Sequence, residues 1–208
     1  KNEDKDASAE YVRRSLEGLD KKWKAWDRLG AVIYRNAVSV ATLNKLPEIE
    51  EWIAQAFERF PDAIFTTVDV AYYAFVHYWD KKDYGQAIHW GTVYLKGIDN
   101  YRAGKYLTSD LTRGVLENAS PFWERKILTM LPQAYLENGA TVVLCGSKPE
   151  TAQNAVGRLK AENPAWKVEG IAPNLTDYDS VKEAFDAVEK KYGGIDILVI
   201  NAGVFDSA

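Results

Sequence analysis

A tyrosine stands four residues before a lysine at Tyr78–Lys82 and at Tyr101–Lys105. A lysine ammonium beside a phenol lowers the pKa of the phenol, so such a pair can act as a general acid. The chain contains 12 tyrosines, however, so this spacing is expected by chance. We therefore assign no catalytic residue from the sequence.

Few residues of the sequence could bind a metal or act as a reactive thiol. His77 and His89 lie on neighbouring helical segments without the carboxylate spacing of a metal site, so we predict no metal. The single cysteine, Cys145, excludes an internal disulfide and indicates a reducing compartment, which we take as the cytoplasm. No basic cluster activates Cys145, so we expect it to pack as a small apolar group at the end of a strand.

Composition excludes several classes of protein. A chain of 208 residues with 47% hydrophobic residues and both charge signs is typical of a folded protein. A net charge of -4 gives no basic face for nucleic acid, and no apolar run is long enough to span a membrane. The first ten residues, KNEDKDASAE, carry no apolar core, so we expect a solvated tail rather than a signal peptide.

The first half of the chain has the apolar spacing of helices. Val68–Val76 is rich in β-branched residues and could be a strand instead. We expect Gly97 to break a helix and Ser120-Pro121 to begin one. The predicted helices are Trp23–Leu43, Ile49–Phe60, Val70–Tyr78, Tyr84–Leu95 and Phe122–Leu136.

The second half alternates short apolar runs with amphipathic stretches, which predicts a parallel sheet of three strands with helical crossovers. Ser147 and Glu150 have the spacing of a capping box at the start of the first helix. The predicted strands are Thr141–Cys145, Lys167–Ala172 and Ile195–Asn201, and the helices between them are Pro149–Glu162 and Asp179–Tyr192.

Three motifs of this half follow one another over roughly 65 residues. They are Gly139–Leu144 before a strand, Asn174-Leu175-Thr176 after the next, and Gly194–Val199 leading into Asn201-Ala202-Gly203. In their order and spacing these motifs resemble the short-chain dehydrogenase/reductase family, which implies a partial Rossmann-like fold and a nucleotide site. Ile200 stands where the family's motif has its first asparagine.

The resemblance also implies roles for single residues. Asn201, Ala202 and Gly203 correspond to the end of a central strand beside the cofactor's ribose, where small residues let the backbone approach. Asn174 and Leu175 correspond to the position beside the adenine ring.

Ser147 and Lys148 follow the first strand of this half, where the family's NAD-dependent members have an acidic residue. A hydroxyl and an ammonium suit a 2′-phosphate, so the resemblance implies NADP as the cofactor. The alternative is that Ser147 only caps a helix and that Lys148 is a solvated loop charge.

Two parts of the family pattern are missing. Residues 111–120, where the glycine-rich turn is expected, contain one glycine and follow no apolar strand. The family's serine and Tyr-x-x-x-Lys motif lies beyond Asn-Ala-Gly, and no counterpart follows Gly203 in this sequence. The resemblance therefore implies a nucleotide-binding fragment without oxidoreductase activity.

The first half resembles tetratricopeptide repeats. Trp26-Asp27-Arg28-Leu29-Gly30 matches the opening of the repeat's first helix, and Tyr84-Gly85-Gln86-Ala87-Ile88 matches the start of its second. The roughly 34-residue period is not kept, because 57 residues separate Tyr78 from Tyr135. An irregular helical bundle is the alternative. The aromatic stripe of Trp79, Tyr84, Trp90 and Tyr94 could line a peptide groove, but we interpret it as core.

The sequence thus predicts an α/β protein in which a helical region, residues 1–138, packs on a partial Rossmann-like region, residues 139–208. Three functions stay open: an NADP-type nucleotide-binding fragment, a repeat-like interaction scaffold, and a structural or designed chimera without selected activity. The partners we expect are a peptide or a second copy of the chain, bound through the helical half or the uncovered strand Ile195–Val199.

Overall fold

The computed structural model describes residues 5–19, 26–106 and 110–200, with the backbone alone for residues 26–28, 110–116 and 118–120. The contacts divide the chain into two compact units, Lys1–Ala140 and Thr141–Ala208, which we call the helical unit and the α/β unit. No helix in these described ranges is long and apolar enough to cross a membrane.

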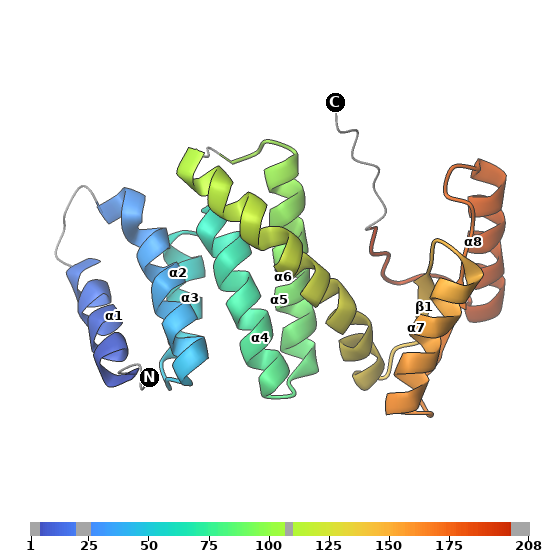
Figure 1. Cartoon of the computed structure of the whole chain (residues 1–208), viewed down its shortest axis with the longest axis horizontal. Coiled ribbons are helices and arrows are strands. Elements are labelled where there is room, and N and C mark those ends of the chain that lie inside the picture. Colours follow the sequence, from blue (N-terminus) through green and yellow to red (C-terminus); the bar gives the residue numbers. More distant parts are fainter. Residues whose placement is uncertain (1–4, 20–25, 107–109, 201–208) are drawn as a thin grey trace. The chain divides into compact units, whose positions relative to one another are not determined.

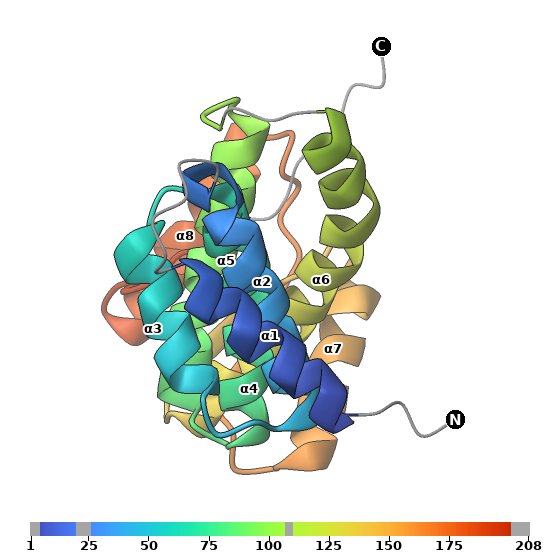
Figure 2. The ribbon, with the colours of Figure 1, turned by 90° about the vertical axis from the view of Figure 1, so that its left-hand side faces the viewer.

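Most helices of the helical unit pack against a neighbour in the chain, whereas η1 packs mainly against α2 and α5. Figures 1 and 2 show α1, α2 and α4 following one another side by side, with α5 next to α4 and α6 next to α5. Its elements are α1 (Lys5–Leu19), α2 (Trp26–Asn44), α3 (Ile49–Arg59), the π-helix η1 (Phe65–Val70), α4 (Ala71–Asp80), α5 (Tyr84–Arg102) and α6 (Asp110–Glu137).

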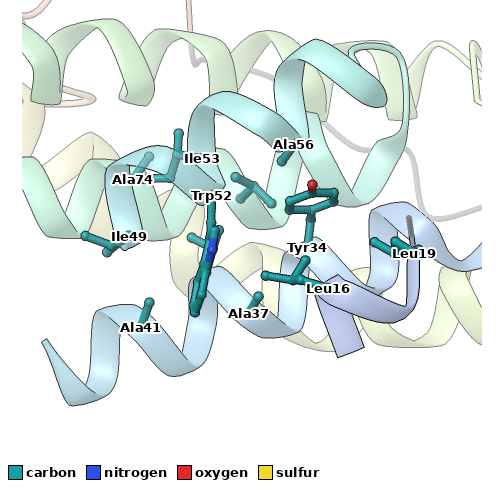
Figure 3. Close-up of a cluster of buried hydrophobic side chains, with 12 residues drawn as sticks. Leu16, Leu19, Tyr34, Ala37, Ala41, Ile49, Trp52, Ile53, Ala56 and Ala74 are labelled. Carbon is teal, nitrogen blue, oxygen red and sulfur yellow. The ribbon is translucent and has the colours of Figure 1, made fainter. Parts of the chain in front are cut away.

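Two apolar clusters hold these helices together. In the first, Tyr34 of α2 and Trp52 of α3 lie among aliphatic side chains that include Leu16 and Leu19 of α1 (Figure 3). The second joins Phe75 of α4 to Tyr94 of α5 and includes Ile127 and Leu131 of α6, and Trp79 and Trp90 pack against it. Tyr94 is fully buried, and both tryptophans and Tyr84 make ring contacts, so the aromatic stripe is packed as core.

The predicted solvated tail is wrong from Lys5 onward, because α1 begins there. The helix α1 has an apolar stripe between its charged residues, because Ala9, Leu16 and Leu19 are buried and share one helical face. The β-strand alternative for Val68–Val76 is also wrong, since η1 and α4 cover that stretch.

Two expected helix boundaries do not occur. The helix α5 continues through Gly97 to Arg102, because a glycine there allows close contact with η1: a Cβ would lie 2.6 Å from the Thr67 carbonyl oxygen. The helix α6 begins at Asp110 and continues through Pro121. Its downstream half is held by the buried Ile127, which lies in the second cluster.

The α/β unit contains β1 (Val142–Cys145), α7 (Pro149–Glu162), β2 (Val168–Ile171) and α8 (Tyr178–Tyr192), close to the predicted bounds. The two strands pair in parallel, with Val142 opposite Val168 and Cys145 opposite Ile171. The helix α7 lies close to both strands at Ala152, and a Cβ on Gly146 or Gly170 would come within 3.0 Å of that residue. Glycine is therefore required at both positions by helix packing.

The predicted third strand is wrong for the described residues 195–200, which form no strand, so the sheet described has two strands instead of three. The five aliphatic side chains of this segment are 43–77% exposed, namely Ile195, Ile197, Leu198, Val199 and Ile200. An interior parallel strand needs hydrogen-bonding neighbours and two covered faces. Apolar composition alone does not supply them.

Candidate functional site

Four of the seven predicted site residues follow the carboxyl ends of β1 and β2, at one edge of the sheet. Because the strands are parallel and in register, the loop after β1 and the loop after β2 begin side by side. The Gly146 N–H donates to the Ile171 carbonyl oxygen at 2.9 Å and joins the two loops where they start. Ser147 and Lys148 therefore leave the sheet next to the chain that leads to Asn174.

The capping box predicted for α7 does not form. Lys148, with extended φ and ψ of −146° and 153°, is the N-cap residue, and no side chain caps this helix. Ser147 and Lys148 are both exposed, and within the described residues their side chains make no hydrogen bond or ion pair. The hydroxyl and the ammonium are therefore available for a ligand, although Glu150 in the first turn of α7 adds a negative charge nearby.

Asn174 shapes the second loop. Its Oδ1 accepts hydrogen bonds from the Thr176 N–H at 3.1 Å and the Thr176 hydroxyl at 2.8 Å, and its own N–H donates to the Ser180 hydroxyl at 2.9 Å. These bonds form an Asx turn that holds the loop in place. The turn leaves the neighbouring Leu175 side chain 54% exposed, as an apolar surface beside the sheet edge.

Asn201, Ala202 and Gly203 lie outside the described residues. The described geometry thus concerns four of the seven predicted binding residues: Ser147, Lys148, Asn174 and Leu175.

The Tyr78–Lys82 and Tyr101–Lys105 spacings lie within the helical unit. Tyr101 is partly buried and packs against the second apolar cluster, and the Lys105 ammonium donates to Asn100 Oδ1 at 3.0 Å. Tyr78 also packs there, and burial raises the pKa of its phenol, which opposes action as an acid. Neither spacing shows a lysine bonded to its tyrosine.

The other candidates are placed as follows. His77 Nε2 lies 3.0 Å from Glu50 Oε1, and Glu50 also pairs with Lys81. The hydrogen bond with His77 is the larger cause, and the one with Lys81 the next, of a lowered pKa of the Glu50 carboxyl. In the described ranges, no group of three or more His, Cys, Asp or Glu could hold a metal ion. Cys145 is exposed, so its prediction as a packed apolar group is wrong.

Sequence reasoning missed a buried acid in η1. Asp69 is fully buried, and its Oδ1 accepts from Arg35 Nε of α2 at 3.0 Å. Burial raises the pKa of Asp69, while Arg35 opposes this change. The only signal was an aspartate inside the apolar run Val68–Val76, and nothing in the sequence indicated an arginine 34 residues upstream as its partner.

Residues 129–208 match the short chain dehydrogenase family model. The chain is similar to a 3alpha-hydroxysteroid dehydrogenase of Mediterraneibacter gnavus, with 41% identity over 73 residues, which cover 35% of this chain and 29% of the relative. It is also similar to a 3-oxoacyl-(acyl-carrier-protein) reductase FabG of Thermotoga maritima, with 39% identity over 70 residues, covering 34% and 28%. No solved structure matches the chain significantly.

The C-terminal part of the chain is therefore similar to part of the short-chain dehydrogenase/reductase family. The matched segment spans 29% or less of the length of these two relatives. The parallel pair of β1 and β2 with its α7 crossover is consistent with part of a Rossmann-like fold.

Proposed function

We propose that the α/β unit binds the adenosine 2′-phosphate end of NADP and that this chain transfers no hydride. One observation carries the proposal: the parallel register of β1 and β2 brings the loop of Ser147 and Lys148 beside the loop of Asn174 and Leu175. In a doubly wound sheet, nucleotides bind outside the carboxyl ends of the strands, which is the edge where these loops lie.

The residues present fit the adenosine end of the cofactor. The unbonded Lys148 ammonium and Ser147 hydroxyl would hold the 2′-phosphate, close to the N-terminus of α7, whose free N–H groups also favour an anion. The exposed Leu175 side chain would cover one face of the adenine.

For the parts of NADP beyond the adenosine 2′-phosphate, the described residues offer no comparable binding groups. Residues 110–137 form one continuous helix, so the stretch before β1 supplies no strand and glycine turn to hold a pyrophosphate. The reduced cofactor, NADPH, would supply a transferable hydride when bound. The Tyr78–Lys82 and Tyr101–Lys105 spacings lie in the helical unit and show no bond between tyrosine and lysine, so we assign this chain binding without proton transfer to a substrate.

Titration with NADPH, NADH and 2′,5′-ADP, followed by cofactor fluorescence or calorimetry, tests the proposal. We expect saturable binding of NADPH and 2′,5′-ADP, with NADPH at least about tenfold tighter than NADH, because one charged contact to phosphate is worth about this factor. Lys148→Ala should abolish the preference. Lys190→Ala, which removes another exposed lysine of the same unit, should leave it unchanged.

Three results would refute the proposal: no saturation, equal binding of NADPH and NADH, or equal effects of the two alanine variants. Consumption of NADPH with a carbonyl substrate, at a rate proportional to protein concentration, would refute the second half of the proposal alone.

A second function is supported by the helical unit. Most of its helices pack on a sequence neighbour, as in helical-repeat proteins, which use their extended surfaces to bind peptides; η1, which packs mainly on α2 and α5, departs from this pattern. We propose an interaction scaffold of tetratricopeptide-like character as the alternative. A peptide-array screen tests it: binding that survives Lys148→Ala would assign the activity to the helical unit.

A further inference from the structure

Among the described residues of the α/β unit, the edge of β1 that faces away from β2 has no neighbouring strand. The Val142 N–H donates to the Lys167 carbonyl oxygen at 2.8 Å, and the Gly146 N–H donates to Ile171. Successive residues of a strand direct their N–H and C=O groups to opposite edges, so those of Val143 and Cys145 face away from β2. Within the described residues, no strand pairs with this edge.

The two outer edges of the sheet differ in chemistry. The strand β2 carries Glu169, which pairs with Lys191 of α8, and a charged residue is a common means of protecting an edge strand. The strand β1 reads Val-Val-Leu-Cys and carries no charge. Its sequence is that of an interior strand, which requires a neighbour on each side.

The same unit also carries a strand-like segment without a partner, the run Ile195–Ile200. It contains four β-branched residues and one leucine, and all five side chains are 43–77% exposed. The segment follows Gly193 and Gly194, whose φ angles of +85° and +153° turn the chain at the end of α8. In the part of one copy that the structure describes, therefore, neither the open edge nor the segment that could cover it pairs with another strand.

We propose that residues 195–200 of one copy pair in parallel with the open edge of β1 in a second copy, and that the exchange is reciprocal. Each copy carries both halves of this contact, which is the condition for a closed two-fold dimer formed by exchange of a segment. No other partner is needed to satisfy either half.

The area involved sets the strength of the contact. Complete burial of an aliphatic side chain removes about 60–120 Å² of apolar surface from water. Reciprocal burial of the five side chains, each roughly half exposed, would remove on the order of 300–600 Å² from the two copies together. Stable dimers bury roughly 1,200–2,000 Å², so backbone pairing must supply the remainder, and the dimer should dissociate on dilution.

Sedimentation velocity of the whole chain over a wide range of concentration tests this proposal. We expect a monomer–dimer equilibrium that Leu198→Lys and Val143→Pro each weaken by at least about tenfold. Proline at 143 removes the N–H that faces the open edge and leaves the bonds to β2 intact. The matched control is Leu43→Lys, at a leucine 73% exposed on α2, which should change nothing.

A chain that stays monomeric at every concentration would overturn the proposal, as would a dimer that Leu198→Lys leaves intact or that Leu43→Lys weakens equally. Amide exchange of residues 195–200 in dilute, monomeric protein must be fast; protection there would show that the segment pairs within its own copy. Circular dichroism verifies folding of Val143→Pro, and Leu198→Lys, outside every described element, carries the test if that variant does not fold.

Discussion

Replacement of Gly97 by alanine should destabilise the helical unit, although alanine is the better helix former. The α5 backbone lies so close to η1 that a Cβ at this position would be 2.6 Å from the Thr67 carbonyl oxygen and 3.1 Å from Val68 Cγ2. The first contact is with backbone, which cannot rotate away as a flexible side chain would. Val68 is fully buried, so η1 has no free space into which to move.

Two opposing energies decide whether Gly97→Ala raises or lowers the free energy of unfolding. Overpacking of a filled core costs about 1–3 kcal/mol, while replacing glycine by alanine inside a helix contributes about 1 kcal/mol or less. Because the clash is with backbone, we place its cost in the upper part of that range. The free energy of unfolding should therefore fall by about 1–2 kcal/mol.

Urea unfolding followed by tryptophan fluorescence measures this change as a shift of the midpoint at constant slope. Gly18→Ala is the matched control in α1, because no atom lies within 4 Å of the Cβ it would add. That variant should be as stable as the wild type or slightly more stable. The reasoning is wrong if Gly97→Ala matches the wild type or if both variants change stability in the same direction and by the same amount.

Three further outcomes are expected. Burial raises the pKa of the Asp69 carboxyl above its usual 3.8, although Arg35 opposes this change. The folded state therefore binds the carboxyl proton more tightly than the unfolded state does. The free energy of unfolding should fall as the pH rises from 3.8 through the raised pKa. Asp69→Asn should lack that decline in urea midpoints measured across pH, and equal slopes for the two proteins would contradict this assignment. Arg102→Ala should lower the free energy of unfolding by about 1–2 kcal/mol, because Arg102 donates two hydrogen bonds, of 3.0 and 2.7 Å, to the mostly buried Glu124 of α6. The control is Lys182→Ala, which removes one partner of an exposed ion pair and should have a smaller effect in the same urea assay. Cys145 should react with a thiol reagent in the native protein at nearly the rate seen in urea, and strong native protection would show that it is covered.

Local patterns in the sequence determined most of the elements. Helical spacing of apolar residues predicted the central parts of α2 to α5, and the alternation of apolar runs with amphipathic stretches predicted β1, α7, β2 and α8 close to their observed bounds. The predicted end of α8 at Tyr192 is confirmed, and Gly193, which follows it, has a φ of +85°. These features depend on neighbours a few residues away, which a sequence pattern records.

Where a residue's environment comes from distant segments, the sequence could not decide it. Whether Ile195–Ile200 forms a strand depends on a neighbour that pairs with it, and its apolar composition says nothing about whether that neighbour is present. The candidate site also depends on distant segments. Its motifs predicted which residues follow β1 and β2, but only the register of these two strands places the loop after β1 beside the loop after β2. The pairing of Asp69 with Arg35 and the passage of α6 through Pro121 were likewise decided by packing between helices, since tertiary contacts override local propensity when they bury enough surface.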